Sequence, residues 1–246
     1  MEKQLNSQTS AECEARTDLA ANIKLENEKS LRWLGCNAIA LGFIVMFSGM
    51  LIYGMDNPFT SISASANFYG TACLLPFVLG GMSIFFWNYR GYEPIDRITT
   101  KTMSIAAVFV ALFQCSEFGG RCTPSRISLL GLPPEWSNAI HLISAITLFG
   151  ALIFWLAFLF TKTTKGSSWK KMTPTKRIRN IIYYFTGAFA FVGLIFTVLN
   201  LAKITEVPYV WLWEEVILIP SGFALLVKSG LPWFADKPQK KAIHAT

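Results

Sequence analysis

The chain has 246 residues, of which 52% are hydrophobic and only 15% are charged, and its formal net charge is +7. Soluble domains carry about 25% charged residues, so this composition argues against a soluble globular protein. The basic residues lie beside apolar blocks and accompany no recognition motif, which argues against a nucleic-acid-binding protein.

Six apolar blocks follow one another along the chain, separated by short polar segments. Each is roughly 20 residues long, which as a helix crosses about 30 Å of hydrocarbon. The predicted spans cover residues 34–54, 68–87, 102–118, 138–160, 181–201 and 208–228. We therefore predict an all-α integral membrane protein, a six-transmembrane-helix bundle within residues 34–230. A polar cytoplasmic segment, 1–33, precedes it, and a cytoplasmic tail, 231–246, follows it; the stretch Ala11–Ser30 is either a surface helix or disordered.

The distribution of Lys and Arg predicts the orientation of these spans. Nineteen of the 22 basic residues lie in the N-terminal segment, in the loops after the second and fourth spans, or at the C-terminal end. Only Arg121, Arg126 and Lys203 lie in the other loops. Because loops rich in Lys and Arg stay in the cytoplasm, both termini are expected there. The basic loop from Lys162 to Arg179 either serves only to set this orientation or also binds anionic lipid head groups.

Two cysteines, Cys115 and Cys122, are placed on the outer side by this orientation. Disulfides persist in that compartment, and Gly119 and Gly120 between them let the chain turn. We predict a Cys115–Cys122 disulfide; the alternative is a pair of unrelated thiols.

Polar side chains inside predicted spans are costly and usually functional. Here they gather toward the outer ends of the spans, so we predict a polar pocket that opens outward. Glu214 is the deepest, and Arg121, Arg126 and His141 are its candidate partners by depth. Glu117 and Glu215 either belong to this pocket or lie at the wet interface. The candidate pocket residues are Ser61, Ser63, Asn67, Gln114, Glu117, His141, Asn200, Glu214 and Ser221.

Motifs for metal and cofactor chemistry are missing from the sequence. A catalytic zinc ion usually takes three protein ligands, and His141 is the only histidine in a predicted span, so no metal is expected. The chain has no P-loop and no dinucleotide fingerprint, and no other cofactor is expected. The residue types of a serine hydrolase are present in Ser61 or Ser63, His141 and Glu214. The sequence has no G-x-S-x-G motif, which forms the nucleophile elbow of many such enzymes.

Three segments carry a resemblance to a known group. They are SIS at residues 61–63, His141 in HLISA, and WEEVILIPSGFALLVKSG over the sixth span. They resemble the SIS-Y, H…A and W-E…F-G…K-G motifs of uncharacterised bacterial multi-span membrane proteins, with Glu214, Gly222 and Lys228 on the last pattern. That group is faintly similar to the superfamily of alkaline ceramidases and progestin/adipoQ receptors, whose members hold zinc with three histidines. The resemblance implies a location in the bacterial inner membrane.

These observations lead to one functional expectation and two alternatives. We expect a multi-pass protein of the plasma membrane whose outward pocket binds a small molecule or a lipid head group, with membrane lipids as its partners. The alternatives are an intramembrane lipid-modifying hydrolase, which would use His141, Glu214 and an outer serine, and a small transporter.

Overall fold

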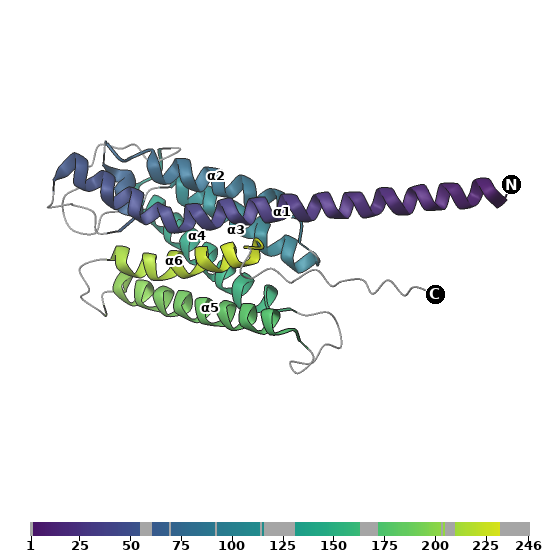
Figure 1. Cartoon of the computed structure of the whole chain (residues 1–246). Helices are drawn as coiled ribbons and strands as arrows, with labels where there is room; N and C mark the ends of the chain where they lie inside the picture. Colours follow the sequence, from purple (N-terminus) through teal and green to yellow (C-terminus); the bar gives the residue numbers. More distant parts are fainter. Residues whose placement is uncertain are drawn as a thin grey trace.

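The structure is a computed structural model, and every regular element that it describes is helical. It describes residues 2–54, 61–68, 70–91, 93–113, 115, 131–162, 172–202, 204 and 210–231, with side chains from residue 16 onward. The elements in chain order are α1 (Glu2–Tyr53), η1 (Ser63–Asn67), α2 (Leu74–Asn88), α3 (Pro94–Leu112), α4 (Pro134–Phe154), η3 (Trp155–Leu159), α5 (Pro174–Leu201) and α6 (Val210–Lys228). The long helices run side by side along a common axis (Figure 1).

Four helical stretches are long and apolar enough to cross a membrane, as a helical membrane protein requires. They are Arg16–Tyr53, Pro134–Leu159, Pro174–Leu201 and Val210–Lys228. The apolar helix α2 is shorter, and α3 carries three charged residues in its first half. The count of six spans and the placement of both termini therefore stay predictions.

Helix α1 is a continuous helix of 52 residues, and its N-terminal part projects beyond the bundle (Figure 1). The sequence left open whether the region before residue 34 is helical. The structure makes it helical from Glu2, consistent with the lack of Gly and Pro before Gly35.

Helices α2 and α3 differ in their bounds from the predicted spans. Helix α2 begins at Leu74, because the residues before it form η1 and a series of turns. Helix α3 begins at Pro94, where the Glu93 N–H donates to Asp96 Oδ2 at 3.1 Å. It ends at Leu112, because Phe113 adopts an extended backbone. Helix α3 therefore ends before Gln114 and Glu117, which the predicted third span included and which lie outside the described residues.

Helix α6 packs most closely against α1 and α5, and glycines permit these contacts. A Cβ atom on Gly222 of α6 would lie 2.7 Å from the carbonyl oxygen of Gly35 in α1. Glu215 lies seven residues before Gly222 in α6, and Gly42 lies seven residues after Gly35 in α1. The Glu215 side chain fills the space beside Gly42. The two pairs place α1 and α6 antiparallel and in one register. Small residues allow this close approach of backbones, which is how helices associate in membranes.

Candidate functional site

The candidate site lies at the end of the bundle where α1 ends and α6 begins, which we call the distal end. Residues 61–68 lie there in a short segment that contains only the 3₁₀ helix η1, and none of its side chains is exposed. Irregular backbone is tolerated at membrane depth only where its polar groups find partners within the protein. Ser61 Oγ accepts from the Ala64 N–H at 2.9 Å, and Ser65 Oγ donates to the Ile62 carbonyl at 2.6 Å. The serine-rich sequence thus supplies partners for its own backbone.

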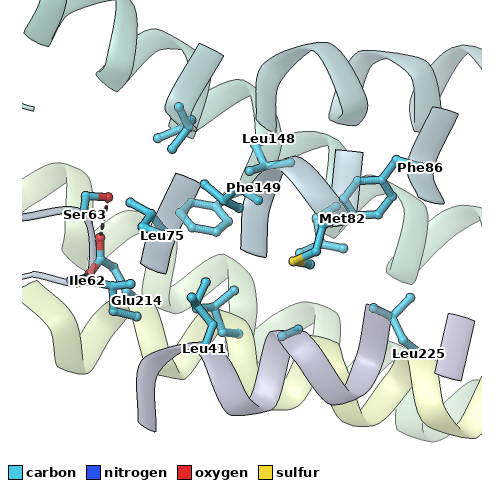
Figure 2. Close-up of a pocket in the computed structure, with 16 residues that line it drawn as sticks. Leu41, Ile62, Ser63, Leu75, Met82, Phe86, Leu148, Phe149, Glu214 and Leu225 are labelled. Atoms are coloured by element: carbon cyan, nitrogen blue, oxygen red, sulfur yellow. Dashed lines mark hydrogen bonds between the residues drawn. The ribbon is translucent and has the colours of Figure 1, made fainter. Parts of the chain in front are cut away.

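Glu214 in α6 holds this segment against the bundle. The Ile62 N–H donates to Glu214 Oε2 at 2.6 Å, and Ser63 Oγ makes a longer contact of 3.5 Å with Oε1 (Figure 2). Glu214 is only 7% exposed, so the carboxyl group replaces water as the acceptor for the buried N–H. Of the partners expected for Glu214, Arg121 and Arg126 lie outside the described residues.

His141, the third expected partner, bonds to the chain that follows α3. Its Nδ1 lies 2.7 Å from the Phe113 carbonyl oxygen. Because a carbonyl only accepts, this contact assigns the ring proton to Nδ1 and leaves a lone pair on Nε2 in the neutral ring. Asn67 Nδ2 likewise donates to the Cys115 carbonyl at 3.0 Å. Both side chains therefore donate to carbonyls just past the end of α3, because the helix ends at Leu112 and its own N–H groups no longer reach them.

These polar groups line a small cavity, which we call the polar cavity. Its volume is about 40 Å³, enough for one or more water-sized groups. The rest of its lining is apolar and comes from α4, α5 and α6. The polar side chains that line it are Ser61, Ser63, Cys115, His141, Thr197 and Glu214.

A second, apolar cavity of about 50 Å³ adjoins the first, because Ser63, Ala145, Phe149 and Glu214 line both. It runs along α2 from Leu75 to Phe86, a distance of about 16 Å at 1.5 Å per residue. Figure 2 shows Ser63 and Glu214 at one end and apolar side chains along the rest of its length.

Aromatic side chains lie at the far end of the apolar cavity. Phe86 lines it, and the ring of Trp155 packs edge-on against Phe86 with centroids 6.1 Å apart. Trp155 belongs to η3 and is fully buried. The cavity is thus a slender, apolar space whose polar groups are at the distal end.

The structure does not bring every candidate residue into these cavities. Ser221 is fully buried in α6, and its Oγ has no hydrogen-bond partner among the described residues. Asn200 is half-buried in α5 and lines neither cavity. Gln114, Glu117 and Cys122 lie outside the described residues, so the predicted disulfide stays a prediction. Glu215, for which a wet interface was one alternative, is 7% exposed, and both of its carboxyl oxygens lack a partner within the described part of the chain.

Several contributors to the site were not among the sequence candidates. Ile62 and Phe113 contribute only backbone groups, which carry no signature in side-chain identity. Thr197 was not in the candidate list, although its spacing places it on one stripe of the fifth span with Asn200. The apolar lining has the same composition as any membrane-facing surface and gives no signal of its own.

In the described part of the chain, no three His, Cys, Asp or Glu side chains come together as metal ligands would. The length and apolar character of its helices place the chain in the class of helical membrane proteins. Comparison with protein-family models, curated proteins and solved structures gives no match to this chain.

Proposed function

We propose that this protein binds an amphipathic molecule in its two adjoining cavities. The polar end of the ligand would lie beside Glu214, Ser63 and His141, and its apolar chain would lie between the helices in the apolar cavity. One observation carries the proposal: the Glu214 carboxyl group lies where a polar cavity meets an apolar one. Specific ligand sites combine a mostly apolar lining with a few convergent polar groups, as these cavities do.

The polar groups indicate the chemistry of the ligand's polar end. Glu214 offers carboxyl oxygens, and His141 offers the Nε2 lone pair once Nδ1 has donated to Phe113. Acceptors therefore outnumber donors, which favours a hydroxyl or amine on the ligand over a phosphate or carboxylate. The apolar cavity is slender, so it suits a single alkyl chain. A single-chain lipid with a hydroxyl or amine head fits both requirements.

The proposed orientation directs the polar cavity outward. The six-span topology places both termini in the cytoplasm, and the Lys and Arg distribution supports it. The distal end then faces the extracytoplasmic side of the plasma membrane, and the resemblance to bacterial proteins favours the inner membrane. Ligands would enter from the outer leaflet or from the space outside it.

A lipid hydrolase is the second candidate function. It is favoured by the placement of His141 and two serines around one cavity. A serine nucleophile requires a hydrogen bond to its base. Among the described residues, neither serine is hydrogen-bonded to His141: Ser63 Oγ faces Glu214, and His141 bonds to the Phe113 carbonyl. Binding without bond cleavage therefore fits the geometry better.

Lipid extraction from the purified protein tests the proposal. After purification in a mild detergent, mass spectrometry should find a single-chain lipid bound at close to one molecule per chain. Leu79→Trp would fill the apolar cavity and should remove the lipid, whereas Phe77→Trp on the same helix should keep it, because Phe77 is 82% exposed. Ala145→Leu is a milder second filling variant. Retention of the lipid by folded Leu79→Trp and Ala145→Leu would contradict the proposal.

A further inference from the structure

A large basic cleft lies at the opposite end of the bundle, which we call the proximal end. It has a volume of about 670 Å³ and lies between α1, the end of α2 and the first turns of α3. None of its lining residues belongs to the polar or apolar cavity. Its basic lining residues are Lys24, Arg90, Arg97 and Lys101.

The cleft is held in shape by contacts between its walls. Asn27 Nδ2 donates to the Arg90 carbonyl at 2.6 Å, and Asn27 Oδ1 accepts from the Arg90 N–H at 3.1 Å. This two-way pairing fixes α1 to the chain that follows α2. On the other wall, Arg97 and Lys101 are four residues apart on α3 and share one face. Lys101 Nζ lies 4.8 Å from the centre of the Trp87 ring, which joins α3 to α2.

The described lining of the cleft carries positive charge without negative charge. Among the described residues, no Asp or Glu lines it. Within the described ranges, Arg90, Arg97 and Lys101 form no salt bridge, and Lys24 has only Glu28 at 3.9 Å. Like charges that share one cleft repel each other, and a bound anion would reduce this repulsion. Two arginines also favour phosphate, since the guanidinium group can bind it with two parallel hydrogen bonds.

The surroundings of the cleft point to a lipid as the source of the anion. Trp87 is 51% exposed at the end of the apolar helix α2, as aromatic residues at a membrane interface are. Ile84 on α2 and Ile98 on α3, each three residues from a lining residue on its helix, also have exposed apolar side chains. A lipid could therefore lay its chains along α2 and α3 while its head group enters the cleft.

We propose that this cleft binds the phosphate-bearing head group of an anionic membrane lipid. The site differs from the basic loop between Lys162 and Arg179, because none of the described residues of that loop lines it. Occupancy would also bind the projecting part of α1 to the membrane surface through Lys24 and Asn27. The proposal does not depend on what the polar cavity binds.

A pair of matched double variants tests the cleft. The full-length protein is titrated with phosphatidylglycerol or phosphatidylcholine, and binding is measured by native mass spectrometry. Each basic residue at an anionic surface contributes roughly a fivefold factor, so R97Q/K101Q should bind phosphatidylglycerol about 30-fold more weakly. K29Q/R32Q removes the same charge from exposed positions of α1 that do not line the cleft, and should change binding less than threefold.

Two further measurements separate the cleft from general electrostatics and from a soluble ligand. Asn27→Ala keeps every charge but removes the pairing with Arg90, and it should also weaken phosphatidylglycerol binding. Inorganic phosphate at the same concentration should not compete with the lipid. Equal losses in the two double variants, equal binding of phosphatidylcholine, or full competition by inorganic phosphate would each overturn the proposal.

Discussion

The replacement of Glu214 tests whether its carboxyl group holds residues 61–68 against the bundle. In Glu214→Ala the buried Ile62 N–H loses its acceptor at 2.6 Å. A buried donor left without a partner costs about 1–3 kcal/mol, although hydrogen bonds between membrane helices average only about 0.6 kcal/mol. In Glu214→Gln the carboxamide oxygen can accept the same hydrogen, so its cost should stay below about 1 kcal/mol. We expect the alanine variant to be the less stable of the two by about 1–2 kcal/mol.

Thermal unfolding of the purified protein in detergent measures this difference. At about 2–4 °C per kcal/mol for a chain of this size, Glu214→Ala should unfold roughly 2–8 °C below Glu214→Gln. Glu215→Gln is the matched control, because it makes the same chemical change one residue later, where the carboxyl oxygens have no hydrogen-bond partner among the described residues. Its melting temperature should stay at or above that of the wild type. Equal melting temperatures for the Ala and Gln variants of Glu214 would refute the reasoning.

Three other predictions concern the fold. Gly222→Ala should destabilise the protein by about 1–3 kcal/mol, because the new Cβ would lie 2.7 Å from the Gly35 carbonyl oxygen. At Gly80 a Cβ meets open space, so Gly80→Ala should be neutral or stabilising. If the melting temperature of Gly80→Ala is the lower of the two, the α1–α6 packing is contradicted. Non-reducing mass spectrometry should find Cys115 and Cys122 joined, and two free thiols would exclude the disulfide. Tags at both termini should resist a membrane-impermeant reagent on intact cells, and modification of either tag would contradict the six-span topology.

The helical fold follows from features that are visible in the sequence, but the bounds of α3 do not. An apolar block marks where a helix can contact lipid, not where its backbone begins and ends. Helix α3 begins with the polar turn from Pro94, which Asp96 caps, and this turn carries no hydropathy signal. A search for capping residues around Glu93 would have found it. At the other end, the extended Phe113 ends the helix, and His141 from α4 bonds to its carbonyl, a contact that only the assembled bundle reveals.

The sequence predicted at which end of the bundle the site residues lie, but not which groups they contact. Ser63, His141 and Glu214 were assigned to one end of the bundle by chain direction, and the structure places them around one cavity. Asn200 was assigned to the same depth, yet Thr197, three residues earlier, lines the cavity instead. One residue corresponds to about 100° of rotation about a helix axis, and hydropathy does not determine that rotation. The main partner of Glu214 is a backbone N–H group, which no residue pattern predicts.

The apolar cavity follows from packing between helices that are apolar on several sides. Leu79 and Leu148 line it, while Phe77 and Ile143 on the same two helices are exposed. Membrane helices carry apolar side chains both toward lipid and toward each other, so composition does not separate the two faces. Only the arrangement of five helices around Glu214 shows which leucines enclose a space.

The most direct test of the proposed binding function is an experimental density map of the protein purified with its native lipids. We predict elongated density that begins beside Glu214 and His141 and continues between α2, α4 and α6 toward Phe86. The Glu214→Gln variant should show weaker density at the polar end. A map that resolves these side chains and shows them packed against one another, with no space or density between Leu79 and Leu148, would contradict the account.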